Sequence, residues 1–297
     1  MSYLNEMQAF AHEQGLLGRI IPDGKLRRAN TVERPNSLEA WLVAYPNHLT
    51  IGNWRTGMKY TWRPQDNSLT HQDKEELRLA RLAYKAEIAK KQLEAAKVCE
   101  GIWHQTILIN ENPYLTKKQI QRHIARMDRF NNLVVPVSSF HGKLMSLQFI
   151  PPKGAKRFKS GGVVSGNAAM IGSFDNTGTL LVCEGYATGC SLHEATNLPV
   201  VVAFNAGNLE AVCKTLSLAH PTFKLVLCAD NDHQTERKTG INVGLDKARI
   251  IAEKLNVLWL WPEFEADNQG SDFNDIHCQH GLQALTNLLI PAINGGY

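Results

Sequence analysis

Two stretches decide the fold, Leu180-Leu-Val-Cys-Glu184-Gly185 and, about 45 residues later, Lys224-Leu-Val-Leu-Cys-Ala-Asp230-Asn-Asp232. Each is an apolar run of strand length that ends in carboxylates, a pattern typical of buried parallel strands whose acids lie at the carboxyl edge of a sheet. If the two strands are neighbours, Glu184, Asp230 and Asp232 come together. Such a cluster suits Mg²⁺, which binds a few carboxylates and leaves its other positions to water and phosphates.

The sequence around these stretches alternates between strand and helix patterns. We expect strands at 180–183, 200–204, 225–229 and 257–261, and helices at 187–195, 209–218 and 243–255. This regularity predicts an α/β fold with a mostly parallel sheet flanked by helices, and ligands of such sheets bind beyond the carboxyl ends of the strands. Glu184, Asn208, Asp230 and Asp232 all fall at that edge.

The chain in front of this region divides into three further parts. The predicted organisation is a small α+β module at 1–70 with a β-rich core, a long charged helix at 71–101, a smaller basic α+β subdomain at 102–175, and the catalytic α/β domain at 176–297. In the basic subdomain we expect a short helix at 117–126 and a hairpin of strands at 133–137 and 143–150.

Composition limits the class of protein. With 43% hydrophobic and 20% charged residues in 297, the chain is typical of a globular protein, and no apolar run reaches the ~20 residues that cross a membrane. Because we find no signal peptide at Met1, a cytoplasmic location is the default expectation. The six cysteines are scattered without a Cys-x-x-Cys pair, so we expect neither zinc nor disulfides.

Charge is divided unevenly along the chain. Residues 1–160 carry 25 Lys and Arg against 14 Asp and Glu, whereas residues 161–297 carry 7 against 14. A basic front half beside an acidic back half favours phosphate chemistry on a polyanion, although uneven charge can also arise without function.

Two groups in the basic half are candidate binding residues. Lys153, Lys156, Arg157 and Lys159 lie in one loop before paired glycines, which predicts phosphate or nucleic-acid contacts, with a plain exposed loop as the alternative. Near the N-terminus, aromatic residues alternate with cations, and Trp54, Tyr60 and Trp62 are candidates for stacking on single-stranded DNA. The alternative is that these aromatics form the core of a small β-domain.

The acids themselves indicate a reaction type. Two carboxylates in Asp230-Asn-Asp232 can bind one Mg²⁺ or bridge two, and repulsion between them makes a metal the natural compensation. Glu184, from another strand, can ligate or accept a proton from an attacking hydroxyl or water. An isolated Asp-x-Asp is also common in solvated turns, so the prediction depends on the combination with Glu184.

These motifs together resemble a known family. Glu184-Gly185 and Asp230-Asn-Asp232 in this order are similar to the Toprim domain of bacterial-type primases, topoisomerases and some nucleases. Three longer motifs resemble the Toprim DNA primases of phages and conjugative plasmids. They are Glu184-Gly-Tyr-Ala-Thr-Gly189, Ala203-Phe-Asn-Ala-Gly-Asn-Leu209 and Ser271-Asp-Phe-Asn-Asp275. Upstream segments such as Leu133-Val-Val-Pro-Val and Asn53-Trp-Arg-Thr-Gly57 extend the resemblance over nearly the whole chain.

The resemblance implies a DNA primase that joins ribonucleotides on single-stranded DNA. Glu184, Asp230 and Asp232 would form the centre for Mg²⁺, or alternatively Mn²⁺, and Asn208 with the Lys153–Lys159 loop would contact nucleotide or DNA. Expected partners are single-stranded DNA, ribonucleoside triphosphates and a replicative helicase, with no membrane. A Toprim nuclease or a non-catalytic factor that binds single-stranded DNA in replication or transfer are the alternatives.

Overall fold

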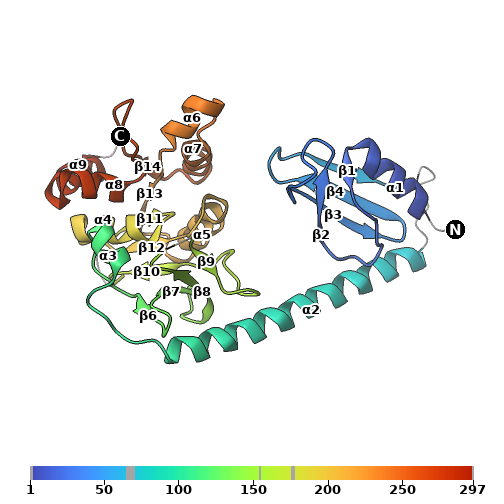
Figure 1. Cartoon of the computed structure of the whole chain (residues 1–297), viewed down its shortest axis with the longest axis horizontal. Coiled ribbons are helices and arrows are strands. Elements are labelled where there is room, and N and C mark those ends of the chain that lie inside the picture. Colours follow the sequence, from blue (N-terminus) through green and yellow to red (C-terminus); the bar gives the residue numbers. More distant parts are fainter. Residues whose placement is uncertain (1–2, 65–70, 154, 175–177, 296–297) are drawn as a thin grey trace. The chain divides into compact units, whose positions relative to one another are not determined.

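The computed structural model describes residues 3–64, 71–153, 155–174 and 178–295 (Figure 1). The chain forms two compact units, Met1–Lys91 and Gln92–Tyr297. The boundary between them lies inside one long helix, α2 (His71–His104). Helix α2 is rich in charged residues and contains no proline, as expected for the predicted linking helix. No helix in the described part of the chain is long and apolar enough to cross a membrane.

The first unit is an antiparallel sheet with one helix on it. Its elements are α1 (Leu4–Glu13), β1 (Leu16–Leu17), β2 (Arg27–Thr31), β3 (Ala40–Tyr45), β4 (His48–Asn53) and β5 (Lys59–Trp62), with the strands in sequence order. Met7 and Ala11 of α1 are completely buried against one face of the sheet, where Leu42 and Ile51 also lie. The β-rich N-terminal part predicted from the sequence is therefore confirmed.

The second unit begins with a small antiparallel sheet. It contains α3 (Pro113–Lys118), β6 (Arg126–Met127), β7 (Leu133–Ser138), β8 (Leu144–Ile150) and β9 (Arg157–Phe158), in the order β6-β7-β8-β9. The hairpin at 133–150 is as predicted. The prediction of a helix at 117–126 is wrong, because the helix found here, α3, spans Pro113–Lys118. It starts earlier, because Asn112 caps it and Pro113 suits its first turn, and it stops where Gln119 adopts a left-handed conformation.

The C-terminal region is a five-stranded sheet with helices on both faces. Its strands are β10 (Ala169–Ile171), β11 (Thr179–Cys183), β12 (Val200–Val202), β13 (Lys224–Cys228) and β14 (Leu258–Leu260), in the order β10-β12-β11-β13-β14. All neighbours pair in parallel except β10, which is antiparallel to β12. The mostly parallel sheet predicted from the alternating pattern is confirmed, and β11 lies at its centre.

The helices divide between the two faces of this sheet. They are α4 (Tyr186–Thr196), α5 (Ala206–Ala219), α6 (His233–Thr239), α7 (Val243–Leu255), α8 (Phe273–His280) and α9 (Leu282–Gly295). Helices α4, α8 and α9 pack with Leu181 and Cys183 in one apolar cluster, while α5 and α7 pack with Leu180 and Val182 in the other. Because successive residues of β11 point to opposite faces, this short strand is buried on both sides.

Candidate metal centre

The predicted acids lie at one edge of the five-stranded sheet. Cys183, the last residue of β11, is directly opposite Cys228, the last residue of β13, in parallel register. Glu184 follows the first strand, and Asp230 and Asp232 follow the second, where Asp232 begins helix α6. The apolar strands are buried and the chain turns out of the sheet at the acids, so the carboxylates are delivered to the edge where parallel strands bind ligands.

Burial and the charges of neighbouring acids disfavour ionisation of Glu184 and Asp230. Burial, followed by the charge of Asp232, raises the pKa of Glu184 to about 7. Burial, followed by the charge of Glu184, raises the pKa of Asp230 to about 8. Oδ1 of Asp230 is buried and has no hydrogen-bond partner among the described residues. A buried acceptor without a donor, in a field of other carboxylates, fits a site that is completed by a cation.

A fourth carboxylate, Asp272, belongs to the same edge. Its side chain caps α8 by accepting a hydrogen bond from the Asp275 backbone amide at 2.9 Å. Burial, followed by the charge of Asp275, raises its pKa, and its own charge contributes to the raised pKa of Asp230. The backbone of Asn231 donates to Ser271 O at 2.6 Å, which ties the turn after β13 to the start of α8.

Asp272 lies in the segment Ser271-Asp-Phe-Asn-Asp275 but is not among the acids predicted from the sequence. The available signal was its position one residue before an apolar-periodic helix start, a pattern that also marks an ordinary helix cap. Only its proximity to Asp230 distinguishes it.

The acids are close enough to affect one another without all converging on one point. In the described ranges, no group of three His, Cys, Asp or Glu side chains is arranged to hold a single metal ion directly. Mg²⁺ commonly uses only one or two protein carboxylates and keeps several waters. The unpartnered oxygen of Asp230 and the raised pKa values therefore fit a divalent cation held by few direct ligands.

The four predicted cations of the 153–159 loop are dispersed. Nζ of Lys156 lies 5.3 Å from the centre of the Tyr114 ring, and its charge lowers the pKa of Asp230. Although Lys156 is exposed in part, burial of its ammonium lowers its own pKa. Lys153 is exposed, and Lys159 is half-buried. Arg157 instead lines a cavity of about 420 Å³ between the small sheet and the end of α2. Of the four cations, Lys156 is thus the one whose charge is shown to act on Asp230.

Two cations that were not predicted from the sequence act on the acids. Nζ of Lys118 is 3.3 Å from Oδ1 of Asp275, and its charge opposes the rise in the pKa of Asp272. The charge of Lys247, on α7, opposes the rise in the pKa of Glu184. Both lysines lie on helices whose sequence pattern is that of an ordinary solvent-exposed helix. No local pattern therefore distinguishes them from other surface lysines.

Asn208 has a structural position. Its side chain is 3% exposed. Its Oδ1 accepts from Gly166 N at 2.7 Å, and its Nδ2 donates to Asn167 O and Ala203 O, each at 2.9 Å. The amide therefore joins the segment before β10 to the end of β12, and both its ends are used within the protein. The expected nucleotide contact by Asn208 stays a prediction that this bonding does not favour.

The N-terminal aromatics differ in their surroundings. Tyr60 and Trp62 are half-buried against the apolar core of the first unit, and Trp62 packs on Tyr3 with ring centres 5.6 Å apart. Trp54 is 50% exposed. Of the three predicted stacking residues, Trp54 is the one whose ring is most open to solvent.

The comparisons with known proteins agree with this architecture. Residues 179–283 match the family model described as a Toprim domain, so the chain contains a Toprim domain. A DNA primase TraC of Escherichia coli is 29% identical over 260 residues, which are 82% of this chain and 24% of that protein. A second Escherichia coli DNA primase TraC is 30% identical over 259 residues, which are 82% of this chain and 18% of that protein.

The resemblance to Toprim DNA primases of plasmids and phages is thereby confirmed. The chain spans a quarter or less of the length of these curated relatives. Among solved structures, the primase fragment of the bacteriophage T7 primase-helicase protein is similar to this chain at 17% identity and a TM-score of 0.43, covering 59% of this chain and 72% of that one.

Proposed function

We propose that this chain is a DNA primase that joins ribonucleotides on single-stranded DNA by metal-dependent nucleotidyl transfer. The observation that carries the proposal is the position of Glu184, Asp230 and Asp232 at one edge of a Toprim sheet, with an unpartnered buried oxygen on Asp230. The similarity to the TraC primases supports synthesis as the reaction.

Each acid has a separate task in this proposal. Asp230 and Asp232 hold Mg²⁺, with Mn²⁺ as the alternative, and Asp272 adds negative charge beside them. The bound cation supplies stabilisation of the charge that develops on the transferred phosphate and on pyrophosphate. Glu184, which reaches the site from the neighbouring strand, ligates or accepts the proton of the primer 3′-hydroxyl.

The cations around the acids orient the triphosphate. Lys156 is the candidate for this role, because its charge already acts on Asp230. Lys118 is engaged by Asp275 at 3.3 Å and holds the start of α8 in place. Single-stranded DNA, ribonucleoside triphosphates and a replicative helicase are the partners that this function requires or expects.

The test uses the full chain with single-stranded DNA, labelled ribonucleotides and Mg²⁺. Asp230→Asn keeps the shape of the side chain and removes its charge, and Asp267→Asn makes the same change at an exposed acid of the same domain. We expect short RNA products that the first variant reduces on the order of 100-fold or more, as for the loss of a main electrostatic group, and that the second leaves unchanged.

Two results would count against synthesis. Shortened template without RNA products, lost in Asp230→Asn, would assign the acids to a nuclease. Binding of single-stranded DNA without either product, equal in both variants, would assign the chain to the non-catalytic class.

A further inference from the structure

The outer face of the sheet in the first unit is not covered by α1. Successive side chains of a strand point to opposite faces of the sheet. Leu42 and Ile51 are buried on the inner face, so the residues next to them in β3 and β4 point to the outer face. The pairing register places Arg28, Trp41, Gly52 and Lys59 in one row across four strands. Four residues further along β3, about 13 Å away at ~3.3 Å per residue, Tyr45 pairs with His48 on the same face.

One end of this outer face is an aromatic shelf. A side-chain carbon on Gly52 would lie 2.5 Å from the indole of Trp41, so this ring lies directly over the bare backbone of β4. The ring centre of Trp54 is 6.3 Å from that of Trp41, and the guanidinium of Arg28 lies 4.9 Å from the Trp54 ring. Lys59 completes the row on an exposed edge strand. Flat aromatic rings bordered by cations can stack nucleic-acid bases and bind the adjoining phosphates.

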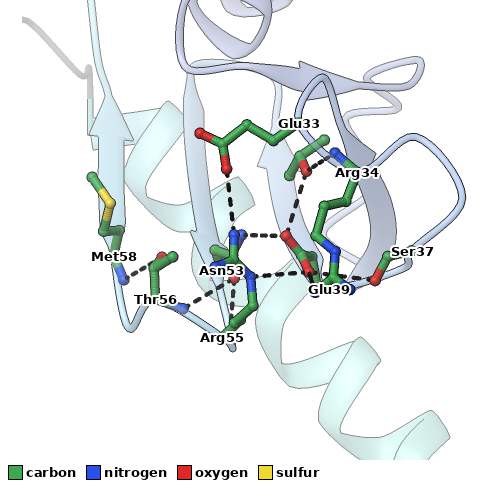
Figure 2. Close-up of polar contacts among 9 residues, drawn as sticks. Glu33, Arg34, Ser37, Glu39, Asn53, Arg55, Thr56 and Met58 are labelled. Atoms are coloured by element: carbon green, nitrogen blue, oxygen red, sulfur yellow. Dashed lines mark hydrogen bonds and ion pairs between the residues drawn. The ribbon is translucent and has the colours of Figure 1, made fainter. Parts of the chain in front are cut away.

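A hydrogen-bonded network fixes the turn that carries Trp54 (Figure 2). The carboxylate of Glu39, which is 8% exposed, accepts from Arg34 and Arg55 at 3.2 Å each and from Asn53 at 3.3 Å. The backbone of Trp54 donates to Glu39 O at 3.0 Å. The acid beside the shelf is therefore paired with two guanidinium groups, and the shelf is held in place before any ligand arrives.

The other end of the face is a basic cavity of about 450 Å³. Its lining includes His48 and the cations Arg63, Lys74, Arg78, Arg81 and Lys85. The last four are spaced by four, three and four residues and form one stripe of α2. Arg78 is paired with Glu75 of its own helix, while no carboxylate of the described side chains lines the cavity.

Contacts on both elements hold the cavity together. Arg81 lies 5.3 Å from the centre of the Tyr45 ring. Lys25 pairs with Glu87 at 3.3 Å, and the Tyr84 hydroxyl accepts from Leu26 N at 3.3 Å, so the first half of α2 is attached to the sheet. Burial, and then the charges of Arg63 and Arg81, lower the pKa of His48, as expected where cations gather without acids.

We propose that this outer face binds single-stranded nucleic acid, with phosphates in the basic cavity and bases on the Trp41–Trp54 shelf. Charge complementarity identifies a polyanion, because the cavity has five cations and no described acid. The exposed ring of Trp54 beside the half-buried ring of Trp41 favours single strands, whose bases are free to stack. The face belongs to a different compact unit from the Toprim acids, so its binding does not depend on the proposed catalysis.

The test is fluorescence anisotropy of a labelled single-stranded oligonucleotide, as DNA and as RNA, titrated with the full chain at several salt concentrations. Arg63→Gln with Lys85→Gln removes two cavity charges, and Arg19→Gln with Lys90→Gln removes one arginine and one lysine at exposed positions elsewhere in the unit. The cavity variant is expected to bind more weakly, and the slope of log K against log salt concentration should fall by about 0.7 per lost phosphate contact. The control variant should keep the wild-type affinity and the wild-type slope.

The shelf is tested separately with Trp54→Leu and Trp54→Phe. The first is expected to weaken binding about 5- to 150-fold, the equivalent of ~1–3 kcal/mol per stacked base, with an unchanged salt slope, and the second to retain most of the affinity. Thermal unfolding of each variant confirms that it is folded.

Three results would overturn the proposal. These are equal losses in the cavity and control variants, wild-type affinity in Trp54→Leu, and duplex DNA bound as tightly as single strands. If DNA and RNA both bind and both respond to the variants, the face recognises the strand chemistry that they share, and the tighter of the two identifies the preferred strand.

Discussion

At the scale of single residues, Asp230 is an expensive side chain to bury. Its carboxylate is surrounded by three other acids that act on it, and one oxygen has no donor among the described residues. A folded-state pKa of about 8, above the ordinary value of 3.8, means that ionisation of this group opposes folding when no cation is present. The site therefore stores repulsion that a cation can relieve.

This repulsion makes stability depend on pH. Glu184 and Asp230 bind more protons in the folded chain than in the unfolded chain, so stability without metal falls as pH rises from about 4 to about 8 through the Asp230 pKa. Mg²⁺ favours the ionised folded form, and we expect it to raise the melting temperature more at pH 8 than at pH 5.

Asp230→Asn removes the charge and should raise the metal-free melting temperature at pH 8, by ~2–4 °C for each kcal/mol of repulsion relieved. The Mg²⁺ shift should shrink in the same variant. Scanning calorimetry at both pH values measures both effects, and a Mg²⁺ shift as large as in the wild type would show that the cation binds elsewhere.

Asn208 gives a second prediction at this scale. Asn208→Ala leaves the backbone groups that its amide serves without partners in a buried place, which costs about 1–3 kcal/mol or more for each unsatisfied group. We expect a clear loss of stability in denaturant unfolding. Asn287→Ala, at an exposed position of α9, should change stability by less than about 0.5 kcal/mol. Normal stability combined with weaker nucleotide binding would instead favour a ligand role for Asn208.

At the scale of elements, two glycines within helices differ in the space around them. Gly189 of α4 faces the sheet, and an added carbon there would lie 2.6 Å from Cγ2 of Val202. Gly101 of α2 has no neighbouring heavy atom within 4 Å of such a carbon. The first allows close packing of a helix on the sheet, and the second is a place where the helix merely lacks a side chain.

Gly189→Ala is therefore expected to destabilise the chain by about 1–3 kcal/mol through overpacking. Gly101→Ala is expected to stabilise α2 by roughly 0.5–1 kcal/mol, because alanine loses less backbone entropy in a helix. Chemical denaturation of the two variants compares them directly, and a change of the same sign in both would refute the close approach of α4 to β12.

At the scale of the whole molecule, the two proposed activities belong to different units. The Toprim acids lie in Gln92–Tyr297 and the basic outer face in Met1–Lys91. The first unit has an excess of cations, with 14 Lys and Arg against 10 Asp and Glu, whereas residues 92–297 carry 18 of each. Template binding and chemistry should therefore be separable by mutation.

We expect Asp230→Asn to bind single-stranded DNA with wild-type affinity while it loses synthesis. The double variant Arg63→Gln with Lys85→Gln should keep its maximal rate but need several-fold more template to reach it. Initial rates against template concentration, paired with the binding measurement, test this. A fall in maximal rate with unchanged template requirement would place these cations in the catalytic step.

The sequence predicted much of the C-terminal domain because its signals are local. Apolar runs such as 180–183 and 225–229 are short, bounded by turns and separated by helices, so the parallel sheet and the strand-end acids follow from pattern. The register that pairs Cys183 with Cys228 is a consequence of packing on both faces of the sheet. The end of helix α3 was predicted wrongly because Gln119 adopts a left-handed conformation, which is unusual for glutamine and cannot be inferred from its residue type.

The sequence alone determined the α/β class, the position of Glu184, Asp230 and Asp232 at strand ends, and the basic character of the front half, since these depend on residue type and spacing. Only the tertiary structure decided that Asp272 joins the acids, that Asn208 is bonded within the protein, and that Trp41 and Trp54 share an exposed face while Tyr60 and Trp62 pack inward. The physical reason is that burial and charge interaction depend on distances between residues far apart in the chain, and folding sets these distances through side-chain packing.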